Sequence, residues 1–253
     1  MMFVNCSQAR KETKLSYIGG TNISSKIKKN LKVNMLTYIV YLAPSDHSGH
    51  NVCTSSTVEC RLGCLATSGR NMMDINSGKH IINNARVRKT QLFFDHNEYY
   101  MEWLVAEIKS KQLKAIKDNN LFSVRLNGTS DINWQEIMLN GKNIFEIFPD
   151  VQFYDYTKNA KKFINIAKNY DLTFSYTGKN WSTCQRLLSI GYNVAMIFKD
   201  SIPNDYKGYT VLNGDLTDNR IGDLKGCIVG LKWKRIANKE INEQIKNSVF
   251  VIQ

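Results

Sequence analysis

Three cysteines lie within one short segment, at Cys53, Cys60 and Cys64, in the run NVCTSSTVECRLGCLATSGR. Their spacing is C-x6-C-x3-C, and they follow the most apolar stretch of the chain, MLTYIVYLAPS. Three thiolates on one loop just past a strand can hold a metal ion or an iron–sulfur cluster. Three ligands also leave one coordination position open, which is typical of catalytic rather than structural sites. This loop is therefore where we expect the chemistry of the protein.

The spacing of the cysteines leaves the identity of the metal open. A 4Fe-4S cluster held by three cysteines keeps one iron free for a substrate or cofactor, and this is the arrangement we expect. Zinc is the alternative, but zinc sites usually contain C-x2-C pairs and four ligands. A zinc site here would recruit His47, His50 or another residue as its fourth ligand. The third interpretation is three unrelated thiols.

A second group of candidates consists of polar residues that follow or end short apolar runs. Five of them are expected to bind or protonate a substrate: Asp131, Asp155, Lys158, Asp215 and Lys232. Four others are expected to bind a cofactor: Asn127, Tyr156, Thr177 and Lys234. The alternative for such residues is a role in turns and helix caps. We favour a site because separate parallel strands would bring these side chains to one mouth, together with the cysteine loop.

The elements that would position these residues follow from the hydrophobic pattern. A first strand is predicted at 36–42, directly before the cysteine loop, and a long helical region at 81–119. Asp95 and Glu98 resemble a capping box inside that region. Six further strands are predicted at 121–126, 151–154, 172–176, 194–198, 209–212 and 227–231. Helices are expected at 158–169 and 182–190.

Strands that alternate with helices indicate a parallel sheet with right-handed crossovers. Seven nearly continuous apolar strands favour an α/β fold of the TIM type, an irregular or partial (β/α) barrel with a cysteine-rich loop after its first strand. The polar and basic residues 1–34 are predicted to form an N-terminal arm, and residues 35–253 a single domain. A barrel would place the candidate site at the carboxyl ends of its strands.

Composition and charge limit the class of protein. The chain has 253 residues, 43% of them hydrophobic, with no apolar run long enough to span a membrane and no signal-peptide pattern. We therefore expect a cytoplasmic protein without a membrane partner, whose six cysteines are reduced thiols or metal ligands. The net charge of +12 suits a nucleotide or nucleic acid. The competing explanation is AT-rich coding, since the lysines are mostly scattered.

Several segments together resemble the bacteriophage gene product 88 family. They are LSYIGGTNISSKIKKN, CTSSTVECRLGCLATSGR, VRLNGTSDINW, FPDVQFYDYTKN, LNGDLTDNRIGD and GCIVGLKWK. The resemblance covers residues 15–235 and implies a phage origin, the host cytoplasm as location, and a barrel in which Cys53, Cys60 and Cys64 hold a cluster. Some relatives of this general type look like distant radical S-adenosylmethionine (radical-SAM) barrels. The chain departs from that pattern because it has neither CxxxCxxC spacing nor a GGE-like segment.

These observations predict a phage metalloprotein. The leading hypothesis is an iron–sulfur, radical-SAM-like enzyme that acts on a nucleotide or nucleic-acid substrate, with S-adenosylmethionine as the implied cofactor. The alternative is a zinc-stabilised nucleic-acid-binding or host-interaction protein without catalysis.

Overall fold

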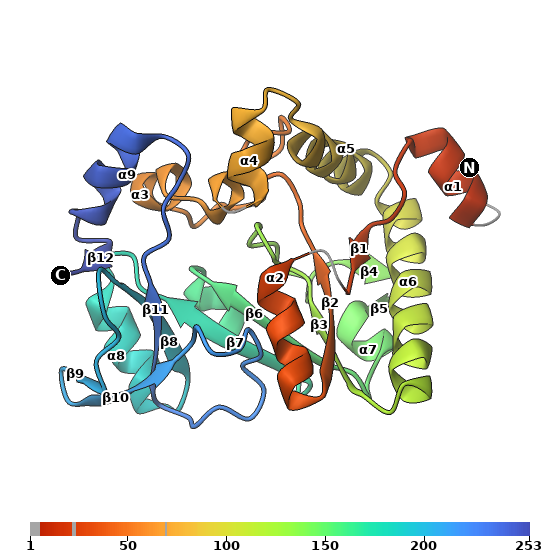
Figure 1. Ribbon diagram of the computed structural model, residues 1–253. Coiled ribbons are helices and arrows are strands. Elements are labelled where there is room, and N and C mark those ends of the chain that lie inside the picture. The colour runs from red at the N-terminus through yellow and green to blue at the C-terminus, as the bar shows by residue number, and fades with distance from the viewer. Residues whose placement is uncertain (1–5, 22–23, 69) are drawn as a thin grey trace.

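The computed structural model describes residues 6–21, 24–68 and 70–253 (Figure 1). Its centre is a ten-stranded mixed sheet, in which β12 (Val251–Ile252) pairs with β8 beside the main path. The other nine strands are, in spatial order, β1 (Gly19–Gly20), β2 (Met35–Val40), β3 (Leu121–Arg125), β6 (Gln152–Thr157), β7 (Tyr170–Ser175), β8 (Asn193–Phe198), β11 (Ile228–Lys232), β10 (Tyr209–Asn213) and β9 (Asp205–Tyr206). A separate hairpin joins β4 (Met138–Leu139) to β5 (Lys142–Asn143).

All seven predicted strands are present, as β2, β3, β6, β7, β8, β10 and β11, and they run parallel to one another. The prediction of a (β/α) barrel, however, is wrong. Within the described residues the sheet stays open, because its path ends at β1 on one side and β9 on the other. Both edge strands are antiparallel to their neighbours, so neither can extend the parallel ladder. Strands β10 and β11 also exchange their order, and a two-strand hairpin replaces a helical crossover there.

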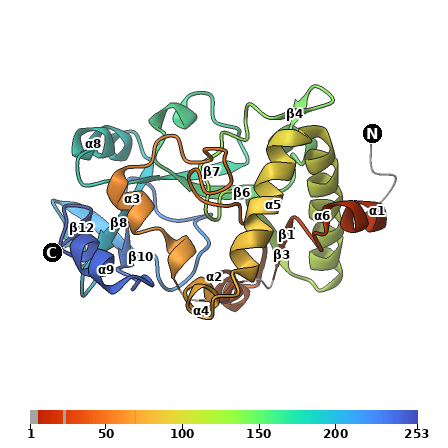
Figure 2. The same cartoon turned by 90° about the horizontal axis from the view of Figure 1, so that it is seen from above.

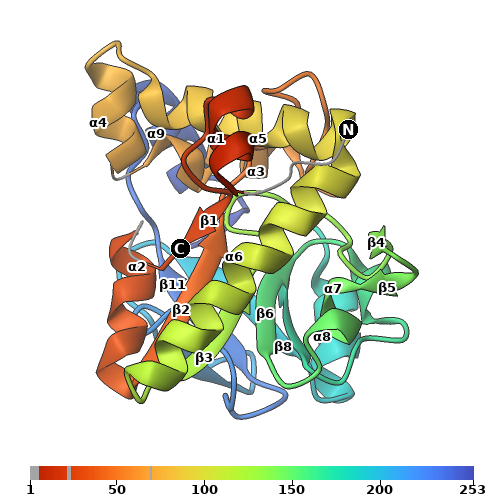
Figure 3. The same ribbon diagram turned by 90° about the vertical axis from the view of Figure 1, so that its right-hand side faces the viewer.

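Helices and short 3-10 turns surround the sheet. Their bounds are α1 (Cys6–Thr13), α2 (Ser25–Lys28), η1 (Lys29–Val33), α3 (Val58–Leu62), η2 (Leu65–Thr67), α4 (Arg70–Asn76), α5 (Ile81–Asp95), α6 (Asn97–Lys117), α7 (Ile144–Ile147), η3 (Ala160–Phe163), α8 (Trp181–Ser189) and α9 (Lys239–Lys246). Figure 3 shows α6 lying across β2 and β3 and α2 standing beside β2, and Figure 1 shows α3, α4, α5 and α9 gathered at one end of the sheet. None of the described helices is long and apolar enough to cross a membrane.

Two predicted helical segments differ from the structure. The region 81–119 forms two helices that meet at His96, where the backbone leaves helical geometry at φ −142° and ψ 58°. His96 rather than Asp95 precedes α6, and no side chain caps that helix, so the expected capping box is absent at this end. The segment 158–169 contains the short 3-10 turn η3 instead of a full helix. The predicted helix at 182–190 is confirmed as α8.

The core lies on both sides of the central strands. All six residues of β2 are buried, as expected for a continuous apolar run in a parallel sheet covered on both faces. One apolar cluster joins β2, β3 and β6 to α5 and α6, and a second joins β7, β8 and β11 to α8. These two clusters pack the strands against the helices. The carboxyl ends of the parallel strands therefore lie together along one edge of the sheet.

The buried side chain of Asn30 links the N-terminal segment to this sheet. Asn30 donates to Thr37 Oγ1 at 2.8 Å and to Tyr154 OH at 3.2 Å. Its Oδ1 accepts from the backbone N–H groups of Asp218 and Asn219. Ile18 and Ile27 are also fully buried. Residues 15–21 and 24–34, which the sequence placed in an arm, thus contribute core contacts and link β2 to the loop after β10.

The C-terminal strand fills a fork in the sheet. Strand β7 pairs with β8 as far as Ala195, and β12 then pairs with β8 at Ile197 and Phe198. Viewed from above, α3 lies beside α9 and β12 (Figure 2). The fork brings Phe250 and Trp233 close to the cysteine segment, where both residues line a cavity.

Candidate functional site

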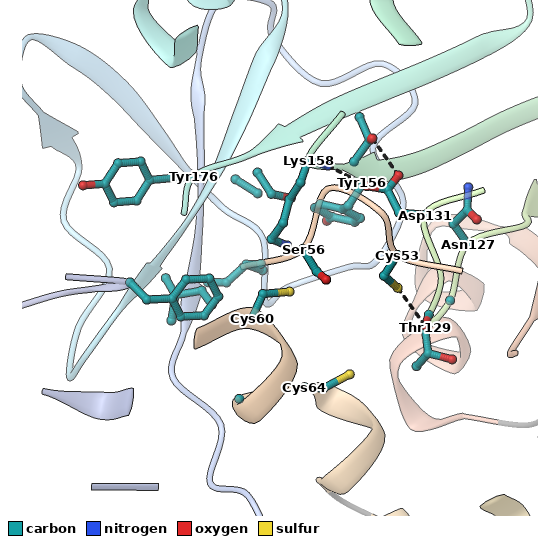
Figure 4. A pocket seen from close by; sticks show the side chains of 18 of the residues that line it. Cys53, Ser56, Cys60, Cys64, Asn127, Thr129, Asp131, Tyr156, Lys158 and Tyr176 are labelled. Carbon is teal, nitrogen blue, oxygen red and sulfur yellow. Dashed lines mark hydrogen bonds between the residues drawn. The ribbon is translucent and has the colours of Figure 1, made fainter. Parts of the chain in front are cut away.

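A cavity of ≈ 200 Å³ lies at the carboxyl ends of β3, β6, β7, β8 and β11, bordered by the cysteine segment (Figure 4). Open α/β sheets usually bind ligands at this edge of the sheet. Nine of the twelve predicted site residues line it: Cys53, Cys60, Cys64, Asn127, Asp131, Tyr156, Lys158, Lys232 and Lys234. Most of the predicted site residues therefore lie at one cavity, although the barrel that was expected to build it is absent from the described chain.

Helix α3 sets the spacing of two cysteines. Thr57 caps it by accepting a hydrogen bond from the Cys60 N–H at 3.2 Å. Cys60 lies inside the helix, and Cys64 follows Gly63 just beyond its end, four residues along the chain. The space around Gly63 is tight, because an added Cβ would lie 3.1 Å from Ile245 and 3.2 Å from Trp233. Helix α9 and the end of β11 therefore hold the cysteine helix against the cavity.

Cys53 reaches the cavity from the loop after β2. Its sulfur is 3.8 Å from the Thr129 carbonyl oxygen, and the Asp131 N–H donates to Val52 O at 2.7 Å. Burial raises the pKa of the Cys53 thiol to about 11, with smaller contributions from Cys64, Asp131 and Cys60. Burial also raises the pKa of Cys64. In Figure 4 the sulfur atoms of Cys60 and Cys64 point to the side of the cavity on which Cys53 lies.

The cysteines fit a metal centre in composition but not yet in arrangement. All three are free thiols on one cavity wall, which provides a donor set that suits iron–sulfur chemistry. Among the described residues, however, no three His, Cys, Asp or Glu side chains already form a metal-binding group. A metal would therefore have to draw the sulfurs together. His50 is engaged elsewhere, because its ring stacks on Phe94 at 4.3 Å and faces Asp95.

Lys158 places a positive charge beside the sulfurs. Its ammonium group is within hydrogen-bonding reach of Cys60. Burial lowers the pKa of Lys158, but the negative charges of Cys60, Asp131 and Cys53 outweigh that effect and raise it overall. Lys158 is therefore charged at neutral pH and would compensate the negative charge that the cysteines carry as thiolates when they bind a metal.

The Asp131 carboxylate is fully engaged in the cavity wall. It accepts from Thr157 Oγ1 at 2.7 Å, from the Lys158 N–H at 2.9 Å and from the ammonium group of Lys162. Lys162 is 1% exposed and also donates to the carbonyl oxygens of Asp131 and Ile132. Asp131 thus positions the ends of β3 and β6, and both of its carboxylate oxygens already accept hydrogen bonds from the protein.

Arg125 lines the cavity and was missed in the sequence. From the end of β3 it donates to both Asp218 carboxylate oxygens, at 2.9 and 2.8 Å. Its guanidinium group lies 4.9 Å from the ring centre of Tyr156, and its Nε is 3.8 Å from Asp155 Oδ1. The sequence feature that could have identified Arg125 is its position as a charged residue inside the apolar run LFSVRL. A charge in a buried strand requires partners, so it indicates a polar network.

Three predicted residues do not line the cavity. Asp155 lies behind its wall, where it accepts from the Asn127 N–H at 2.8 Å and from Tyr170 OH at 3.1 Å. Burial raises the pKa of Asp155 to about 6, although Arg125 and the Asn127 N–H act in the opposite direction. Asp215 accepts from the Lys232 N–H, and Thr177 donates its N–H to Asn180. All three residues hold strand ends in place.

The cavity has one polar and one apolar wall. The polar wall comes from β3 and β6 and includes Asn127, whose amide group contacts Asp155, Ser130 and Trp134. The apolar wall comes from the other strands and the C-terminal segment, and consists of Tyr176, Ala195, Ile197, Leu231, Trp233 and Phe250. Lys232 and Lys234 border the apolar wall. An occupant with an apolar ring and an anionic group would match both surfaces.

The fold and the site define a class: proteins with an open, largely parallel α/β sheet and a cysteine-bordered cavity at its carboxyl edge. The chain belongs to the gene product 88 family of bacteriophage proteins, whose sequence model matches residues 6–248. This confirms the family that the sequence segments indicated. No curated protein and no solved structure matches the chain significantly.

Proposed function

We propose that this chain is a metalloenzyme in which Cys53, Cys60 and Cys64 hold an iron–sulfur cluster. The observation that carries the proposal is the convergence of the three thiols on one cavity at the carboxyl edge of a parallel sheet. Thiols brought together for packing alone would not require a hollow lined with lysine ammonium groups. When bound, such a cluster would supply an open iron position and one-electron chemistry.

The charges of the cavity favour an anionic substrate. Four cationic side chains line it, namely Arg125, Lys158, Lys232 and Lys234, against the single carboxylate of Asp131. Lys162 already pairs with that carboxylate. Arg125 pairs with Asp218, and Lys234 pairs with Asp215 at 3.6 Å. Lys158 and Lys232 therefore supply the positive charge that is available to cysteine thiolates and to a ligand. Together with the apolar wall, it supports a nucleotide or nucleic-acid substrate, in which a flat base accompanies phosphate.

The residues of the chain have separate roles in this proposal. Lys158 compensates the charge at Cys60, and Lys232 and Lys234 bind the anionic part of the substrate. Asp131 and Asp155 position Lys158, Asn127 and Arg125 and do not touch the substrate. S-adenosylmethionine remains part of the proposal as the cofactor that a radical-SAM-like relationship implies.

Anaerobic reconstitution with ferrous iron and sulfide tests the proposal. We expect a brown protein whose reduced form gives the electron paramagnetic resonance signal of a 4Fe-4S cluster. Equilibrium dialysis of the reconstituted protein with adenosine monophosphate should show binding that the K232Q/K234Q double variant weakens at least tenfold. A colourless protein without iron would refute the cluster, and stoichiometric zinc in its place would favour the zinc-stabilised alternative.

A further inference from the structure

The cavity is smaller than the ligand that its walls suggest. Its volume is ≈ 200 Å³, whereas sites for organic ligands of nucleotide size usually measure roughly 300–1,000 Å³. An occupant of that class therefore requires one wall to move. The polar wall is fixed in place, because buried ion pairs join Arg125 to Asp218 and Lys162 to Asp131. The wall that moves is therefore the apolar one.

Part of the apolar wall comes from the segment 239–253, which contains α9 and β12 and contributes Phe250 to the cavity lining. Ile245, Phe250 and Val251 form a small apolar cluster that is separate from the two clusters of the central sheet. This small cluster packs against the cysteine helix α3, which lies beside α9 and β12 in Figure 2. A segment with few buried apolar contacts opens at a lower free energy than the core does.

The end of this segment is held to β8 by a short ladder and a solvent-exposed latch. Strand β12 pairs with β8 over two residues, and the Lys199 N–H donates to Ile252 O at 2.9 Å. The Lys199 ammonium group donates to Asn247 Oδ1 and to Gln253 Oε1, both at 2.8 Å and both exposed. Water replaces exposed hydrogen bonds at little cost, so the latch opens far more easily than the buried ion pairs of the polar wall.

The beginning of the segment is anchored more firmly. Asn242 is buried on α9, and its Oδ1 accepts from Trp233 Nε1 at 3.3 Å and from the Ile236 N–H at 3.1 Å. Helix α9 ends at Lys246. The part of the segment that moves as a unit is therefore residues 247–253, and it carries Phe250.

We propose that residues 247–253 form a lid on the cavity, which leaves β8 to admit a ligand with a flat apolar ring and an anionic group. Phe250 is the gating side chain, because its displacement removes one face of the apolar wall and widens the cavity. Closure returns the Phe250 ring to the bound ligand. This inference deepens the proposed function and rests on it for the class of ligand, but the movement of the lid requires no metal.

Hydrogen–deuterium exchange of the full-length, metal-free protein, read by mass spectrometry, tests the lid. K199M removes both latch bonds and keeps an unbranched side chain. K239M is the matched control, because Lys239 is exposed on the anchored helix α9. Peptides that cover 247–253 report opening of the lid, and peptides that cover the fully buried strand β2 report global unfolding.

We expect residues 247–253 to exchange at least a hundredfold faster than β2 in the wild type. K199M should accelerate exchange of the lid at least fivefold and leave β2 unchanged, and K239M should match the wild type in both regions. Exchange of the lid at the rate of β2, or an unchanged lid in K199M, would overturn the inference and leave the proposed function intact.

A second measurement connects the lid to the ligand. Association of adenosine monophosphate, followed by stopped-flow tryptophan fluorescence, should be at least threefold faster in K199M than in the wild type or K239M, because opening precedes entry. Equal association rates in all three proteins would overturn the gating role of the lid. Absence of binding in the wild type, with the expected exchange pattern, would instead overturn the proposed class of substrate.

Discussion

Single side chains in the wall of the cavity are arranged to hold other side chains rather than to react. Asp131 accepts from Lys162, Thr157 and the Lys158 N–H, and its ion pair with Lys162 is almost fully removed from water. Breaking such a pair leaves an uncompensated buried charge, which costs more free energy than an exposed pair gains.

The first prediction concerns this ion pair. Replacing Lys162 by Met should lower the free energy of unfolding by about 3–5 kcal/mol, because Asp131 is left buried without its cation. Denaturant unfolding monitored by circular dichroism measures the change. Lys161→Met is the matched control, since Lys161 is exposed next to it, and should change stability by less than about 0.5 kcal/mol. Equal effects of both variants would show that the pair does not support the wall.

A second prediction at the scale of the residue concerns pH. The pKa of Asp155 is about 6 in the folded protein, against an ordinary value of 3.8. Between these values the folded protein holds a proton that the unfolded chain has released, so this group makes the unfolding free energy fall as pH rises. Asp155→Asn should remove this pH-dependent part of the unfolding free energy, which is on the order of 2–3 kcal/mol.

The measurement is the unfolding free energy of both proteins from pH 4 to pH 7. The difference between wild type and Asp155→Asn should shift in favour of the variant as pH rises through this window. A difference that stays constant with pH would mean that Asp155 is not held in its protonated form by burial.

At the scale of elements, the site depends on the close approach of β2 and β3 at their carboxyl ends. Gly128 lies where these ends meet, and an added Cβ would be 2.5 Å from the Val40 carbonyl oxygen. That oxygen accepts the Gly128 N–H at 3.0 Å, so the chain cannot move away without losing this hydrogen bond. The close approach also holds Tyr41 beside the cavity.

Gly128→Ala should therefore lower the free energy of unfolding by about 1–3 kcal/mol, because the added methyl group forces the two strand ends apart. Thermal and denaturant unfolding measure the loss. Gly141→Ala is the comparison, since its φ of +76° strains the backbone but no atom lies within reach of the new methyl group. It should cost about 1 kcal/mol and leave the cavity unchanged. A Gly128→Ala protein of wild-type stability would contradict this packing.

For the whole molecule, some of the architecture followed from sequence and some did not. The seven parallel strands were predictable because continuous apolar runs such as MLTYIV are the pattern of strands buried on both faces. The openness of the sheet was not, since it depends on edge strands of two residues each, β1 and β9, which are too short to leave a periodic signal. Two-residue β12, which fills the fork at β8, escaped prediction for the same reason.

The position of the candidate site could be predicted from the sequence, but the roles of its individual residues could be predicted less well. Polar residues after parallel strands converge at one edge, and this rule located Lys158, Lys232 and the cysteines correctly at one cavity. Sequence could not show that Asp155 faces the interior while Tyr156 faces the cavity, because the side of a strand depends on register. Arg125 was missed because its role depends on which partners the fold gives it.

The central claim is that Cys53, Cys60 and Cys64 jointly hold one cluster. Iron and sulfide should be measured per chain after anaerobic reconstitution of the wild type, the three single Cys→Ala variants and Cys184→Ala, which removes a buried thiol outside the cavity. We predict about four irons and four sulfides per chain for the wild type and for Cys184→Ala. Each of the other three variants should retain less than about half of that iron, because a cluster with two ligands is easily lost. Equal iron in all five proteins, or none in the wild type, would contradict the account.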